Sequence, residues 1–420
     1  MVRGRHGHVP VCGNRCLPVA ARCGPRSPRG RRQAQRGSLL RRVRSRDLSR
    51  PRNHVLGATP EEADELIQAA RDLADQGTVP EAAILVAEAS RPSVNVIEPA
   101  DVPRAENAAR LARQVGEPLI ESSALDALTG AHAGLGMVTE AARAAHRRLE
   151  VLAQLPMDVT VGYELLDALN MACEYSVGAG DLHAARAAAV RLRDLPMVVE
   201  EGHLATAQVI VVDAVAGHVT DVRVASERFR EGWERAGRPR APYLGRPPAA
   251  VAMALGLAGD DHARSDWLAV IDALGVGPER LAGFGATFDA IVLLHRGQHG
   301  QALDRLTDEP EDLRRWMSGL WRQWFAALKA EAAVLTGRSD AGERLDRARY
   351  IAVGNPIATA IVDRADALLT GNYIRLLAAA AAFEAAACPY QQARTLVLAG
   401  GVERDDGVAM MTAMGIATPP

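Results

Sequence analysis

The feature that most constrains the fold is a glycine that recurs at the end of successive apolar helical stretches. It stands at Gly77, Gly136, Gly180, Gly217, Gly259, Gly297, Gly337 and Gly371. The separations are 59, 44, 37, 42, 38, 40 and 34 residues, and six of the seven fall in the range of stacked helical hairpins. The spacing therefore predicts an all-α fold, an α-solenoid of stacked antiparallel hairpins. Repeat arrays need no reactive side chain, so contact with a partner can be their function.

The residues around Gly180 show how such a turn is built. Gly180 can take the left-handed conformation that closes one helix, and Asp181 can cap the next. An apolar stripe at spacings of three and four follows, made of Leu182, Ala185, Ala189, Leu192 and Leu195. We therefore expect each recurring glycine to end the first helix of a hairpin.

A second kind of turn is predicted between the hairpins. Gly116-Glu117-Pro118 begins the stretch that reaches Gly136, and Gly354-Asn355-Pro356 begins the one that reaches Gly371. The long first interval therefore contains an extra turn.

Composition agrees with an all-helical chain. Aromatic residues make up only 4% of it, and there is no sustained alternation of Val, Ile and Thr. The run from Gln208 to Asp213 comes nearest to a strand, but it is short and lies in a helical context. We interpret it as the buried face of a helix.

The first 52 residues differ in charge from the rest. They hold 15 arginines and a single acidic residue, Asp47, for a formal charge of +14, whereas the remaining residues carry −16. The chain has 48 arginines and one lysine, Lys329, a usage typical of GC-rich coding sequence. We interpret residues 1–55 as a disordered arm or a spurious extension, and residues 56–418 as the helical domain. The alternative is a basic arm that binds nucleic acid through charge.

The cysteines and histidines predict no metal site. Three cysteines of the arm, Cys12, Cys16 and Cys23, do not have the spacing of a zinc site. Two others, Cys173 and Cys388, stand alone in apolar helical contexts and are expected to be small core residues.

A pair of histidines, His295 and His299, has the spacing of two ligands on one helix. The intervening Gly297 is expected to end that helix, which argues against a shared metal.

The sequence also lacks the common catalytic and cofactor motifs. A phosphate-binding loop requires a lysine, but Lys329 lies in a helical stretch without a glycine loop before it. The glycines between Gly130 and Gly136 follow no strand and lack the dinucleotide spacing. We therefore expect a protein that is not an enzyme, with no catalytic residue, no cofactor and no metal.

Aromatic residues gather between residues 316 and 325. Trp316 and Trp324 fall on one helical stripe, while Trp321 lies on an adjacent flank and Arg322 could frame a groove. Packing in the core is one interpretation of this cluster. The other is a groove for a partner or ligand, with Trp316, Trp321, Trp324 and Arg322 as the candidate binding residues.

Several segments resemble a known class of protein. They are Leu128 to Ala131, Arg147 to Glu150, Gly232 to Pro239, Leu320 to Trp324, Ala381 to Glu384, Cys388 to Leu396 and Met414 to Ala417. Together, over about residues 56–418, they look like the tetratricopeptide-type region of large LuxR-type transcriptional regulators and AAA-containing adenylate cyclases. The resemblance implies a TPR-like scaffold or sensor region without the NTPase, cyclase or helix-turn-helix modules. It carries over no catalytic residue.

Two functions from different classes follow from these observations. The preferred one is a non-catalytic helical-repeat module in bacterial signalling or transcription regulation, which binds a protein or small effector on its concave surface. The alternative is a nucleic-acid-associated protein that uses the basic arm, or a remnant of a disrupted multidomain regulator. We expect a cytoplasmic protein with no membrane partner, because no run is long enough to span a bilayer.

Overall fold

The computed structural model describes residues 60–90, 97–278, 281–313 and 319–420. The arginine-rich arm and its predicted boundary at residue 55 lie outside the described residues, as do Cys12, Cys16, Cys23 and Trp316. Over the residues that are described, the chain forms helices and no strand, which confirms the all-α prediction.

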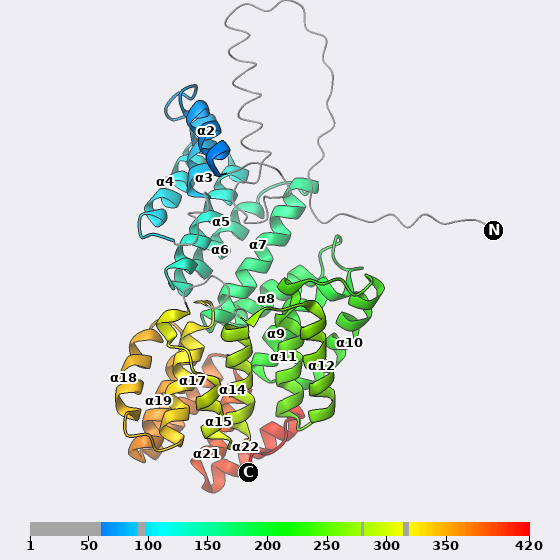
Figure 1. Ribbon diagram of the computed structural model, residues 1–420, viewed down its shortest axis with the longest axis vertical. Helices are drawn as coiled ribbons and strands as arrows, with labels where there is room; N and C mark the ends of the chain where they lie inside the picture. Colours follow the sequence, from blue (N-terminus) through cyan, green and yellow to red (C-terminus); the bar gives the residue numbers. More distant parts are fainter. Residues whose placement is uncertain (1–59, 91–96, 279–280, 314–318) are drawn as a thin grey trace, which may run out of the picture.

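The helices follow one another closely along the chain (Figure 1). They are α2 (Pro60–Arg71), α3 (Val79–Ala89), α4 (Asp101–Gln114), α5 (Pro118–Gly134), α6 (Val138–Leu152), α7 (Val159–Gly178), α8 (Leu182–Arg193), α9 (Gly202–Ala216), α10 (Val219–Arg235), η2 (Pro242–Leu244), α11 (Arg246–Leu257), α12 (Asp261–Leu274), η3 (Leu281–Gly285), α14 (Ala286–His295), α15 (His299–Arg305), η4 (Pro310–Asp312), α17 (Arg322–Leu335), α18 (Ala341–Ile351), α19 (Pro356–Thr370), α20 (Tyr373–Ala385), α21 (Pro389–Ala399) and α22 (Gly401–Met414).

The recurring glycines lie where the sequence predicts them. All eight have a positive φ, between 64° and 100°, and each stands between two consecutive helices. At Gly180 the backbone has φ +77°, and the carboxylate of Asp181 accepts a hydrogen bond of 2.9 Å from the amide of Ala184 in the first turn of α8. The predicted pairing of a left-handed glycine with an N-cap is thus confirmed at this turn.

The second kind of turn and the apolar run are also confirmed. Gly116 and Gly354 have positive φ, and the prolines that follow them begin α5 and α19. The extra turn in the first glycine interval separates α4 from α5. The run from Gln208 to Asp213 lies inside α9, whose residues there are all buried.

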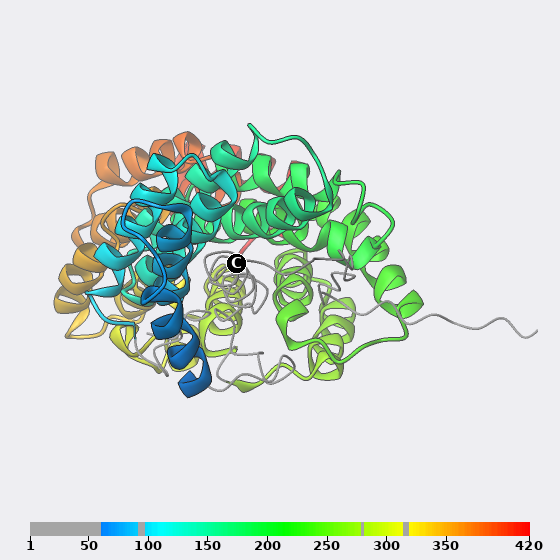
Figure 2. The same cartoon turned by 90° about the horizontal axis from the view of Figure 1, so that it is seen from above.

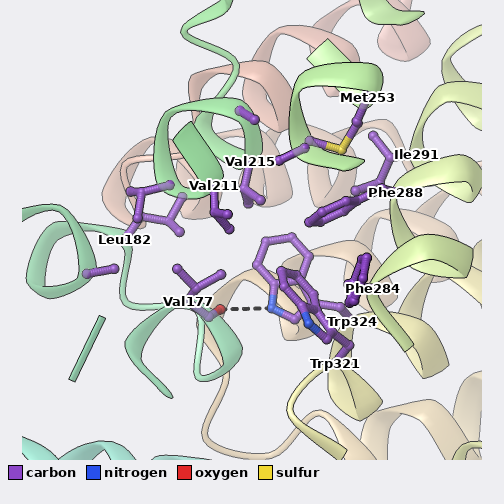
Figure 3. Packing of buried hydrophobic residues seen from close by; sticks show 14 of the residues in the cluster. Val177, Leu182, Val211, Val215, Met253, Phe284, Phe288, Ile291, Trp321 and Trp324 are labelled. Atoms are coloured by element: carbon purple, nitrogen blue, oxygen red, sulfur yellow. Dashed lines mark hydrogen bonds between the residues drawn. The ribbon is translucent and has the colours of Figure 1, made fainter. Parts of the chain in front are cut away.

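The last helices fold back onto the middle of the chain. The indole Nε1 of Trp324, on α17, donates a hydrogen bond of 3.1 Å to the carbonyl of Val177 near the end of α7 (Figure 3). Beyond α22, the amide of Ala417 donates to the carbonyl of Leu257 at the end of α11, over 2.9 Å. Segments separated by more than a hundred residues therefore share one core.

This return of the chain covers much of the surface that the middle helices would otherwise expose. Every residue of α11 is buried, and within α9 Leu204 is only partly buried while the others are buried. Figure 2 shows the successive helices following a curved path. No helix in the described part of the chain is long and apolar enough to cross a membrane.

Candidate functional site

The two described tryptophans of the predicted aromatic groove lie in the core. Trp321 is 1% exposed and Trp324 is fully buried, and both belong to the main hydrophobic core. Figure 3 shows their rings among Phe284, Phe288 and Val215, from three other elements. Of the two interpretations, core packing is the one observed for these tryptophans, because Trp321 packs against Phe288 of α14 and Trp324 against the end of α7.

The third described residue of the aromatic set lies beside the turn between α5 and α6. Arg322 is half-buried, and its Nη1 lies 2.8 Å from the position that a Cβ on Gly136 would occupy. The helix expected to carry the whole cluster is shorter than predicted, since α17 begins at Arg322 and Trp321 precedes it. Trp316 lies outside the described residues. The structure therefore does not establish that the tryptophans share one face of one helix.

An open surface is found instead along one side of α7. Val159, Tyr163 and Asp167 follow one another at a spacing of four, which places them on the same face of the helix. Val159 is 74% exposed and Tyr163 is 50% exposed. From residue 172 to the end of the helix every residue is buried, because Trp324 and its neighbours pack there. One side of the first half of α7 is thus left exposed, while Val161 and Leu165 on its other side are buried.

A buried arginine on α6 organises the acidic part of this surface. Arg148 is 3% exposed, and its guanidinium donates hydrogen bonds to carboxylates of both flanking helices. Nη1 lies 2.9 Å from Asp126 on α5 and 2.7 Å from Asp167 on α7, while Nη2 lies 2.7 Å from Glu164 on α7. The Nε atom donates to the hydroxyl of Ser122 at 3.0 Å. One cation therefore holds three carboxylates together.

These groups carry an excess of negative charge. Burial disfavours the charged guanidinium, but Asp126, Asp167 and Glu164 together raise the pKa of Arg148 above its ordinary value. The side chains of the three acids remain 33%, 24% and 30% exposed, in that order. The three carboxylates are therefore partly exposed, whereas Arg148 faces inward. We call Val159, Tyr163, Asp126, Glu164 and Asp167 the acidic α5–α7 face.

Apolar side chains border this face at the start of α7. Gly162 is buried beneath two methionines, with the Cε of Met197 and the Sδ of Met157 at 2.4 and 3.8 Å from the position of a Cβ there. Both methionines are nevertheless exposed, Met157 at 65% and Met197 at 41%. Exposed apolar residues beside carboxylates suit a partner segment that has both apolar and basic side chains.

The polar residues farther along α7 are already satisfied by the fold. Glu174 forms an ion pair with Arg246 of α11, and both are buried. Gln208 of α9 donates from Nε2 to Asn170 and to Glu174. This network ties α7, α9 and α11 together. Its burial leaves it out of reach of a partner.

A hollow of about 390 Å³ lies elsewhere, between the start of α9 and α10. It is lined by three glutamates, Glu200, Glu227 and Glu231, and by two exposed arginines, Arg228 and Arg235. Its charges of both signs lie at the surface. The hollow therefore has less charge preference than the acidic α5–α7 face.

The remaining sequence candidates are structural. Cys173 and Cys388 are fully buried, as expected for core residues. His295 ends α14 and His299 begins α15, with the left-handed Gly297 between them, so the two do not share a helix. Across the described residues, no group of three or more His, Cys, Asp or Glu has an arrangement that could hold a metal ion.

Comparison with known proteins adds no further assignment: the chain matches no protein-family model and no curated protein.

The acidic α5–α7 face was missed in the sequence, although one signal for it exists. Arg148 occupies an apolar position in the stripe of α6, since Ala141, Ala145 and Leu152 at helical spacing around it are buried. A charged residue at a core position requires partners of opposite charge. The acidic partners of Arg148 are on other helices. They come together only because those helices pack against α6.

Proposed function

We propose that this chain is a non-catalytic, TPR-like helical-repeat scaffold that binds a segment of a protein partner on the acidic α5–α7 face. Support comes from one observation above all: one side of the first half of α7 is exposed, whereas α11 is completely buried and α9 almost completely. A surface that the fold leaves open, with apolar and acidic side chains together, is suited to a protein segment.

The context we propose is bacterial signalling or transcription regulation. This part of the proposal is supported only by the resemblance to the repeat regions of LuxR-type regulators and AAA-containing cyclases. We favour a protein segment over a small effector because the acidic α5–α7 face is a stripe along a helix. The hollow beside α10 lies apart from it.

A photocrosslinking amino acid in place of Tyr163 tests the proposal in the full chain. The control carries the same group at Tyr350, which is 83% exposed on α18. We expect position 163 to crosslink to peptides of a partner protein that contain both basic and apolar residues, as identified by mass spectrometry. The same peptides should not crosslink to position 350. Equal products from both positions, or none from position 163, would contradict the proposed function.

A further inference from the structure

We propose that the hollow between α9 and α10 is a binding site for a small zwitterion, a free α-amino acid with an aliphatic side chain. Its volume of about 390 Å³ lies within the range of small-molecule pockets. The hollow is separate from the acidic α5–α7 face, so this inference does not rest on the proposed function.

Two glycines let the helices beside the hollow meet backbone to backbone. A Cβ on Gly202, at the start of α9, would lie 2.7 Å from the carbonyl oxygen of Arg228 on α10. A Cβ on Gly232 of α10 would lie 2.5 Å from the amide nitrogen of His203. This close contact fixes the start of α9 against α10. The side chains of α10 that line the hollow are therefore held on a rigid element before a ligand arrives.

The charged side chains around the hollow do not pair with one another. Along α10, Glu231 stands three residues after Arg228 and four before Arg235, spacings at which helical ion pairs form. Neither pair is present, and within the described part of the chain none of the five charged lining residues forms an ion pair. The guanidinium of Arg228 donates instead to the carbonyl of Val199, in the turn before α9. Charges of both signs are thus left for a ligand.

A zwitterion complements both signs at once. Its carboxylate can accept hydrogen bonds from Arg228 or Arg235, while its ammonium donates to the glutamates. An anion alone would meet three glutamates, and a cation alone would meet two arginines. The first turn of α9 is not capped by any described side chain, and Gly202 of that turn lines the hollow. This end of the helix adds a partial positive charge that favours the carboxylate.

Two valines indicate what the third part of the ligand is. Val224 of α10 is 68% exposed and Val199 is partly buried, and both line the hollow. An aliphatic group resting on them would remove apolar surface from water. A molecule with an ammonium, a carboxylate and an aliphatic side chain therefore matches the lining, and L-leucine is the simplest probe.

Titration of L-leucine into the full chain with labelled valine methyl groups tests the inference by NMR. We expect saturable shifts at Val199 and Val224, with a Kd on the order of 1 mM for a ligand of this size. Two analogues test each charge, because 4-methylpentanoate lacks the ammonium and 3-methylbutylamine lacks the carboxylate. Each should bind about tenfold more weakly or less. Equal affinity for either analogue, shifts confined to other valines, or no saturation would overturn the proposal.

Charge variants of the hollow supply the second test. Arg228→Gln and Glu231→Gln should each weaken L-leucine binding about fivefold, since each removes one exposed charged contact. Both residues are exposed, so neither change should alter the urea midpoint. Arg223→Gln is the matched control on the same helix, because Arg223 pairs with Asp260 and does not line the hollow. Parent-like binding in both hollow variants, or an equal loss in Arg223→Gln, would overturn the proposal.

Discussion

Arg364 on α19 and Glu331 on α17 form a bidentate ion pair in which both side chains are completely buried. Nε donates to Oε1 over 2.8 Å and Nη2 donates to Oε2 over 2.9 Å. Arg394 on α21 donates to the same carboxylate over 2.8 Å. Burial opposes ionisation, but the two arginines lower the pKa of Glu331 below its ordinary value. One carboxylate thereby joins three helices of the returning half.

Glu331→Ala should be among the most destabilising single changes in the protein. It leaves Arg364 and Arg394 buried without a counter-charge, and the loss of one partner of a buried pair costs about 3–5 kcal/mol. Urea unfolding at neutral pH measures the effect. Asp346→Ala removes an exposed pair with Arg349 and is the control, because it should leave the midpoint unchanged. Similar midpoints for the two variants would show that the buried pair has no special role.

The turn at Gly180 predicts a difference between two glycines of nearly equal backbone conformation. Gly180 has φ +77°, and a Cβ there would lie 2.3 Å from Oδ1 of Asn355; Gly371 has φ +64° and nothing within 4 Å. Gly371→Ala should lower the free energy of unfolding by about 1 kcal/mol, because alanine is strained in the left-handed backbone conformation. Gly180→Ala should cost more, because Asn355 also caps α19 and donates to the carbonyl of Gly178. Thermal unfolding of both variants measures the difference, and equal losses would contradict it.

The helical hairpins could be predicted from the sequence because their signals are local. A glycine with positive φ and a following capping residue, as at Gly180 and Asp181, depends only on neighbouring residues. The same holds for Pro118 and Pro356, which begin their helices. Such features are set by backbone sterics and by the first turn of a helix.

The burial of the tryptophans and the position of the acidic α5–α7 face could not be predicted in this way. Trp324 is buried because Val177, far away in the sequence, lies against it. Asp126 and Asp167 meet because α5 and α7 both pack on α6. A periodic pattern shows which side of a helix is apolar, but it does not show which other helix covers that side.

The imidazole of His295 predicts a loss of stability in mild acid. Burial and the nearby Arg394 lower its pKa from 6.5 to about 4. The unfolded chain therefore binds this proton more readily than the folded chain, so stability falls as the pH decreases from 6.5 towards 4. Over the whole of this pH range, His295 lowers the free energy of unfolding by about 3 kcal/mol. His295→Gln should reduce the difference in urea midpoint between about pH 7 and about pH 5.

Other histidines limit how large this reduction can be. Burial also lowers the pKa values of His132, His146, His203 and His299, so the variant should retain part of the pH dependence. His262→Gln changes an exposed residue on α12 and serves as the control. A pH dependence in His295→Gln as steep as in the parent chain would rule out a contribution from this residue.

Arg148→Met tests whether the arginine holds the acidic α5–α7 face together. The change removes the four hydrogen bonds of the guanidinium and leaves Asp126, Glu164 and Asp167 close to one another. We expect a loss of about 2 kcal/mol at neutral pH, less than for a fully buried pair because the acids are partly exposed.

The pH dependence of this loss identifies its cause. Without Arg148 the three carboxylates repel one another while they are ionised, and this repulsion is absent where carboxyl groups are protonated. The deficit relative to the parent chain should therefore shrink as the pH is lowered through the carboxylate range. If it stays constant, lost packing of the arginine stem accounts for it.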